Sequence, residues 1–169
     1  YIEERKFKFE ENRKKVEQLL PELFLKQKLS KKSEVNMYFG FKGIRTAHEH
    51  TYLKLKEGEE YCYLGIPAYQ PEEQHIYWKR DHLRRTKAKI KCRLFFNQGT
   101  DPKIIKNRNT FSGVKAKSMP IGIKTPAAFV TYKDTVIIVL QSPNPIAVEI
   151  INQEIKDSFQ AYFDEFWKS

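Results

Sequence analysis

The spacing of hydrophobic residues along the chain changes near residue 30. Over residues 1–29 apolar side chains recur every seven positions, at Ile2, Phe9, Val16 and Leu23, with Leu19 in the same stripe. Seven residues make two helical turns, so this spacing predicts a helix with an apolar seam like that of a coiled coil. Pro21 predicts a kink or a restart near the end of this helix.

This helix has two interpretations. It is either an amphipathic helix packed against its own domain or a connector that dimerises through the seam. The chain begins at Tyr1 rather than Met. We therefore expect a preceding domain that this sequence does not include, and we assign residues 1–30 to a helical linker.

From residue 31 the pattern alternates between strand and helix, and we assign residues 31–169 to one globular domain. The predicted strands are 35–39, 61–66, 90–97, 114–118, 127–132, 135–141 and 146–150; the predicted helices are 44–56, 72–88 and 152–167. We expect Gly58 to cap the end of the first helix, Asn152 to cap the start of the last one, and a single helical turn after Pro102. Residues 61–97 have the length of a parallel strand-helix-strand crossover. Lys133 and Asp134 form a tight hairpin turn between two strands. The pattern predicts an α/β fold, a mixed sheet flanked by helices.

Composition limits the class of protein. With 169 residues, 40% of them hydrophobic, the chain can form one sizeable core. The longest apolar run, residues 136–140, has the length of a strand, so no membrane span is predicted. The first ten residues are mostly charged, which argues against a signal peptide and favours the cytoplasm. There we expect Cys62 and Cys92 to be buried and reduced, and no spacing predicts a metal or a cofactor.

The formal net charge of +10 suits a polyanionic partner. The basic run 79–87 contains Arg84 and Arg85, the candidate contacts to nucleic acid or another anion, and aromatic residues for base stacking lie close by. The alternative is that this run forms a solvated helix face.

A partial catalytic signature lies in the predicted hairpin. Asp134, six residues, then Gln141, Ser142, Pro143 and Asn144 resemble the second half of the phospholipase D signature, His-x-Lys-x4-Asp-x6-Gly-Ser-x-Asn. Its His and Lys fall on Ala127 and Phe129. In that family the His attacks phosphorus and the Lys neutralises developing charge, and neither replacement can do so. The resemblance implies a phospholipase D-like sheet without its catalytic residues.

Asp134, Ser142 and Asn144 have two interpretations: ordinary turn chemistry, or a vestigial pocket for an anion or a polar ligand. The four histidines are His48, His50, His75 and His82, and none has Lys two residues later. We expect them to be surface or partly buried residues of helices. No phosphate-binding loop or serine-hydrolase motif is present.

Several runs in order resemble the C-terminal half of TrmB-type transcriptional regulators, chiefly archaeal proteins. They are residues 38–44 (YFGFKGI), 55–60 (LKEGEE), 125–128 (TPAA), 150–159 (IINQEIKDSF) and 166–168 (FWK). The resemblance implies a winged helix-turn-helix that binds DNA, a helical linker that dimerises, and a phospholipase D-like domain that responds to an effector.

We therefore interpret the chain as a non-catalytic effector-sensing and dimerisation domain. The expected partners are a second copy of the chain, DNA through the absent N-terminal domain, and a small-molecule effector. Two alternatives stay open. One is a phosphodiesterase or nuclease of the phospholipase D superfamily, and the other is a basic module that binds nucleic acid directly.

Overall fold

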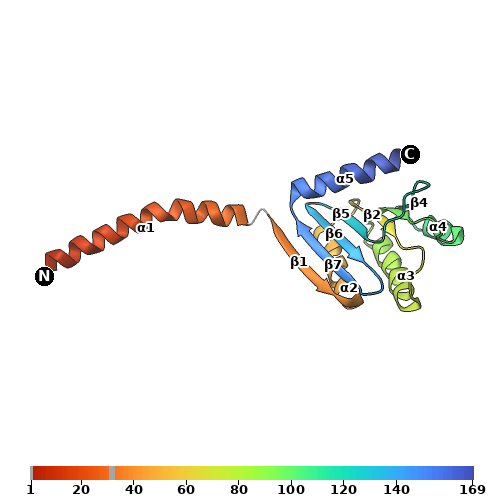
Figure 1. Cartoon of the computed structure of the whole chain (residues 1–169), viewed down its shortest axis with the longest axis horizontal. Helices are drawn as coiled ribbons and strands as arrows, with labels where there is room; N and C mark the ends of the chain where they lie inside the picture. The colour runs from red at the N-terminus through yellow and green to blue at the C-terminus, as the bar shows by residue number, and fades with distance from the viewer. Residues whose placement is uncertain (1, 31–32) are drawn as a thin grey trace. The chain divides into compact units, whose positions relative to one another are not determined.

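The computed structural model describes residues 2–30 and 33–169, which form two compact units, residues 1–34 and 35–169. The first unit is built on helix α1 (Ile2–Ser30), drawn in red and orange in Figure 1. Pro21 lies inside this helix and does not end it, so the predicted restart is wrong. Among the described side chains of α1, Val16 and Leu19 are exposed.

The second unit is a seven-stranded sheet with helices on both faces (Figure 1). Its strands are β1 (Glu34–Phe39), β2 (Glu60–Ile66), β3 (Lys91–Phe96), β4 (Val114–Ser118), β5 (Ala128–Tyr132), β6 (Thr135–Leu140) and β7 (Ile146–Ile151). Its helices are α2 (Gly40–Lys54), α3 (Glu72–Lys87), α4 (Pro102–Arg108) and α5 (Gln153–Lys168). None of the helices in the described part of the chain has the length and apolar character that crossing a membrane requires.

The strands lie in the order β1-β7-β6-β5-β2-β3-β4. β2, β3 and β4 are parallel, whereas β5, β6 and β7 alternate in direction from β2 onwards. The predicted parallel pairing across α3 and the predicted β5–β6 hairpin are both confirmed. β2 lies at the centre of the sheet, and its residues from Tyr61 to Ile66 are all buried because both faces are covered.

The two faces of the sheet have separate cores. On one face Tyr61 and Tyr63 pack beneath α2 and α3. On the other face Cys62 and Leu64 pack with Phe163 of α5. This division follows from the two-residue alternation of side chains along β2. Both Cys62 and Cys92 are buried and free, as predicted.

Local sequence explains several helix boundaries. The Asn152 side chain caps α5 by accepting a hydrogen bond from the Ile155 amide at 2.9 Å, which confirms the predicted cap. Asp101 caps α4 in the same way, and Pro102 occupies the first turn. A complete short helix therefore replaces the predicted single turn. Gly58 was expected to cap α2, but the helix ends at Lys54 and Gly58 lies in the following turn.

We predict that Phe163→Ala lowers the free energy of unfolding by about 3 to 5 kcal/mol, because it empties a fully buried site. The matched control is Tyr162→Ala on the same helix, where the side chain is 60% exposed and the change should stay within about 1 kcal/mol. Urea unfolding measures both. Equal losses would contradict the docking of α5 through Phe163.

Candidate ligand site beneath helices α2 and α3

Helix α3 carries polar side chains on its buried face. The buried residues recur at helical spacing and are Gln74, Trp78, Asp81, His82 and Arg85. Acidic residues in the first turn and basic residues in the last turn favour the helix in this sequence. Buried polar groups cost free energy unless they are hydrogen-bonded, so the partners of this stripe define the interior beneath the helix.

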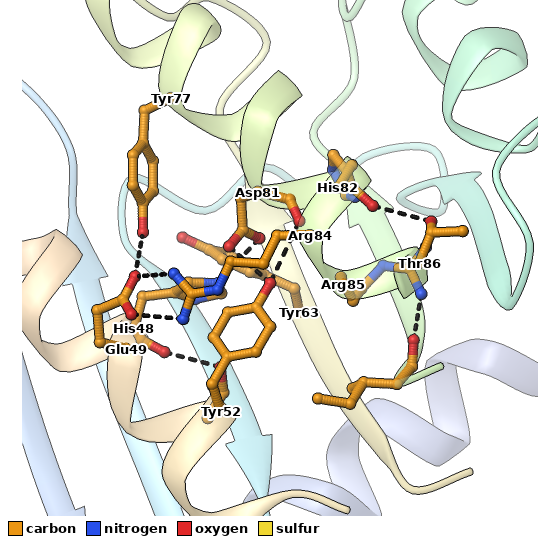
Figure 2. Close-up of polar contacts among 12 residues, drawn as sticks. His48, Glu49, Tyr52, Tyr63, Tyr77, Asp81, His82, Arg84, Arg85 and Thr86 are labelled. Carbon is orange, nitrogen blue, oxygen red and sulfur yellow. Dashed lines mark hydrogen bonds and ion pairs between the residues drawn. The ribbon is translucent and has the colours of Figure 1, made fainter. Parts of the chain in front are cut away.

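Asp81 joins α3 to α2 through two short contacts (Figure 2). His48 Nε2 lies 3.1 Å from Asp81 Oδ2, and the Tyr52 hydroxyl donates to Asp81 Oδ1 at 2.7 Å. His48 and Asp81 are only 3% and 4% exposed. Both carboxylate oxygens of Asp81 are therefore satisfied inside the domain.

A cavity of about 30 Å³ lies beside this pair, against strands β2 and β3. A volume of that size holds roughly two water molecules. Besides His48 and Asp81, its polar wall contains Trp78, His82 and Arg108.

Gln141 closes one side of the cavity. Its side chain accepts a hydrogen bond from Gln70 Nε2 at 3.0 Å and donates to the Tyr63 hydroxyl at 3.1 Å. The Gln74 side chain reaches the Gln141 carbonyl oxygen at 3.4 Å. The glutamine that replaces the glycine of the phospholipase D signature thus forms part of the wall beneath α3.

Burial shifts the pKa values of two side chains in and beside the cavity. Burial, assisted by the nearby charge of Arg108, lowers the pKa of His82 to about 3. Burial raises the pKa of the neighbouring Cys92 thiol to about 12, so no thiolate forms there at neutral pH. The described residues that line the cavity include no Ser, Thr, Cys or Lys. Nor do the described residues contain a cluster of three or more potential metal ligands.

Ala127 and Phe129, the positions of the missing His and Lys, lie away from this cavity. Ala127 precedes β5, and Phe129 within β5 packs on the α5 face of the sheet. The Phe129 ring meets Phe159 of α5 edge to face, with centroids 5.0 Å apart. The position of the signature lysine is therefore filled by a core side chain.

The structure does not bring Asp134, Ser142 and Asn144 together. Asp134 precedes β6 and pairs with Lys54 at 2.9 Å, whereas Ser142 and Asn144 follow the far end of β6 and are exposed. Six residues of strand separate the two ends by roughly 20 Å. A single pocket formed by all three is thus excluded in this fold, while turn chemistry suits each position.

Arg84 and Arg85 are engaged within the domain. Arg84 donates to both carboxylate oxygens of Glu49, at 2.8 and 2.5 Å, and lies over the Tyr52 ring. Arg85 is 0% exposed and donates to the carbonyl oxygens of Ile90 and Ser112. The expectation that Arg85 contacts nucleic acid is therefore wrong for the folded domain, and Arg84 would first have to leave Glu49.

The seam of α1 is described only in part. Val16 and Leu19 are 56% and 53% exposed. The side chains of Ile2, Phe9 and Leu23 lie outside the described residues, so their expected part in dimerisation stays a prediction.

Sequence reasoning missed His48, Asp81, His82 and Arg108 as members of one site. His48 and His82 were expected to be surface or partly buried residues of helices, and both are instead buried within helices α2 and α3. The spacing of Trp78, Asp81 and His82 could have indicated this. It places the two ionisable residues on the same helix face as a large aromatic side chain, and such a face usually packs inward.

No family model matches the chain, and neither does any curated protein. Among solved structures the chain is similar to NucT from Helicobacter pylori, with a TM-score of 0.53 and 10% identity over 81% of this chain and 97% of that chain. NucT is a phospholipase D-like nuclease. At this identity the likeness concerns the fold alone. The predicted phospholipase D-like α/β fold is confirmed.

We predict that Asp81→Asn lowers the free energy of unfolding at neutral pH by about 3 kcal/mol, because it breaks a buried charged contact. Burial alone raises the pKa of Asp81, but His48 and Tyr52 together hold it below its ordinary value of 3.8. The stabilisation should therefore be complete above that value and disappear as the pH falls through the lower pKa of the folded state. Denaturant unfolding at several pH values measures it.

The control is Glu49→Gln, which breaks the partly exposed pair with Arg84 and should cost at most about 1 kcal/mol. A loss for Asp81→Asn no larger than the control loss would contradict the role of Asp81 as the link between α2 and α3.

His82 generates a separate pH prediction. The pKa of His82 falls from an ordinary 6.5 to about 3 on folding. Between these two pH values, His82 is therefore protonated in the unfolded chain and neutral in the folded domain. Between those values His82 should reduce stability by up to about 1.4 kcal/mol for each unit of falling pH. We expect His82→Gln to flatten the pH dependence of unfolding in this window. Identical slopes for the two proteins would contradict the buried, neutral imidazole.

Proposed function

We propose that this chain is a non-catalytic effector-sensing and dimerisation domain of a transcriptional regulator, organised like the C-terminal half of TrmB-type regulators. The observation that carries the proposal is the packing of Phe129 against Phe159, at the position where the phospholipase D signature has its lysine. Ala127 stands where the signature has its nucleophile. A scaffold of this fold without either residue suits recognition rather than turnover.

Dimerisation cannot restore the missing chemistry. A second copy of the chain would contribute the same Ala127 and Phe129, so a site shared between two copies would still lack the imidazole and the ammonium group. This argument disfavours the nuclease alternative, which is supported by the fold shared with NucT. The nucleic-acid alternative is weakened by the burial of Arg85.

The proposed dimer forms through α1. Val16, Leu19, Leu20, Phe24 and Leu25 are large apolar side chains of this helix, each at least 41% exposed. Pairing of two such helices through the predicted seam would bury Val16 and Leu19, whereas Leu25 lies on the opposite side of the helix from Val16. An effector bound in the second unit would act on attached DNA-binding domains only if its affinity differed between two arrangements of the dimer.

We expect the chain to sediment as a dimer at high concentration. Leu19→Asp should weaken that dimer at least about tenfold, because a buried leucine contributes about 1.5 to 3 kcal/mol. Gln18→Asp is the matched control, since it adds the same charge at an exposed neighbouring position outside the seam. Sedimentation equilibrium measures both variants. A strictly monomeric wild-type chain would count against the proposal.

The enzyme alternative is tested with a chromogenic phosphodiester. We expect no hydrolysis above background. Hydrolysis that persisted through purification and was lost in Asp134→Ala would instead support a phosphodiesterase.

A further inference from the structure

Arg108, the last residue of α4, is a buried cation without a carboxylate partner among the described residues. It is 6% exposed, and its Nη1 donates a hydrogen bond to the neighbouring Asn107 Oδ1 at 3.0 Å. Burial lowers the pKa of Arg108, yet a guanidinium stays protonated in proteins. A buried, unpaired charge of this kind costs several kcal/mol.

Two buried hydrogen-bonding atoms on the same cavity wall also have no protein partner. They are Trp78 Nε1 and His82 Nδ1, on side chains 8% and 6% exposed. The indole can only donate. His82 is neutral at physiological pH, and the tautomer with hydrogen on Nδ1 would donate as well. Arg108, Trp78 and His82 all line this cavity, so each can present a donor to a molecule bound there.

The one carboxylate among the described residues that line the cavity forms no ion pair with Arg108. Asp81 lines the same cavity, but His48 and Tyr52 occupy its two oxygens. Arg85, a second buried cation whose charge also acts on His82, is held by neutral carbonyl oxygens. Among the lining residues Arg108 and Asp81 carry one formal charge of each sign, and Arg85 adds a positive charge nearby that acts on His82.

We propose that this cavity binds a small monovalent anion of the size of formate, nitrate or chloride. Arg108 supplies the charge, and Trp78 Nε1 and His82 Nδ1 donate hydrogen bonds. A volume of about 30 Å³ admits an ion of this size but no extended ligand. Anion binding itself does not depend on the proposed function. Only the statement that such an anion is the effector of the domain rests on it.

An approach for the ion lies on the outer side of Arg108. The same side chain borders a groove of about 420 Å³ between α3 and α4. Lys79 and Lys103 also line this groove, with Glu72 as its one carboxylate among the described lining residues. A positive groove raises the local concentration of anions next to the site.

The test follows the Trp78 indole N–H by ¹H–¹⁵N NMR, with the Trp167→Phe variant used to assign the two indole signals. Sodium formate is titrated against sodium methanesulfonate at constant total salt, because the sulfonate head is too large for the cavity. We expect a saturable shift of the Trp78 signal with formate and none with methanesulfonate. At ten times the dissociation constant, formate should raise the melting temperature by about 3 to 6 °C.

Arg108→Gln should weaken formate binding at least tenfold and should not lower stability in methanesulfonate, because the unpaired charge is removed. Lys106→Gln, at an exposed residue of the same helix that lines neither the cavity nor the groove, is the matched control and should retain binding. His82→Gln gives a second test if Arg108→Gln does not fold, and it should also weaken binding.

A linear or absent shift in the wild-type chain would mean that the cavity holds water alone and would overturn the proposal. An unchanged affinity in Arg108→Gln would overturn it as well. The indole signal reports the cavity whether the chain is monomeric or dimeric. Failure of anion binding is therefore distinguishable from failure of the proposed dimerisation.

Discussion

The interior beneath α2 and α3 depends on one buried carboxylate. Asp81 accepts from Tyr52 and lies against His48, and in doing so it links two helices inside the domain, whereas their other ion pair, between Glu49 and Arg84, is partly exposed. Without these partners an ionised Asp81 could not remain buried, because the free-energy cost of desolvating an unpaired charge would exceed the free energy gained by packing the side chain. The position of α3, and with it the cavity, follows from this contact.

The two faces of the sheet bury different kinds of side chain. The α5 face is closed by aromatic packing around Phe163, with Phe95 and Trp167 at centroid distances of 5.3 and 5.4 Å. Such a face gains stability mainly from buried apolar area. The α2 and α3 face combines aromatic side chains with Asp81, His82, Arg85 and Arg108. In the described part of the chain, the buried polar atoms of Trp78 and His82 that lack a partner belong to side chains lining the cavity on this second face.

This division relates the fold to the proposed function. The positions that carry phosphoryl chemistry in the signature fall next to and within the apolar α5 face, where Phe129 serves packing. Gln141, in contrast, turns a position of the same signature into part of the polar cavity wall. In the proposed function, the face that carries the signature positions serves packing, and the other face carries the proposed anion site.

The sequence by itself determined the order of strands and helices, the β5–β6 hairpin, the cap at Asn152 and the replacement of the signature His and Lys. These features are local, because each depends on residues within one turn, one strand or one fixed spacing. Only the tertiary structure decided that the basic run 79–87 faces inward at Asp81, His82 and Arg85. From sequence alone, a polar helix is interpreted as exposed to solvent unless the partners of its polar side chains are known. In this domain the partners come from α2, about thirty residues earlier in the chain, and from loops after β3. Burial of charge is a property of the assembled neighbours, which no local pattern encodes.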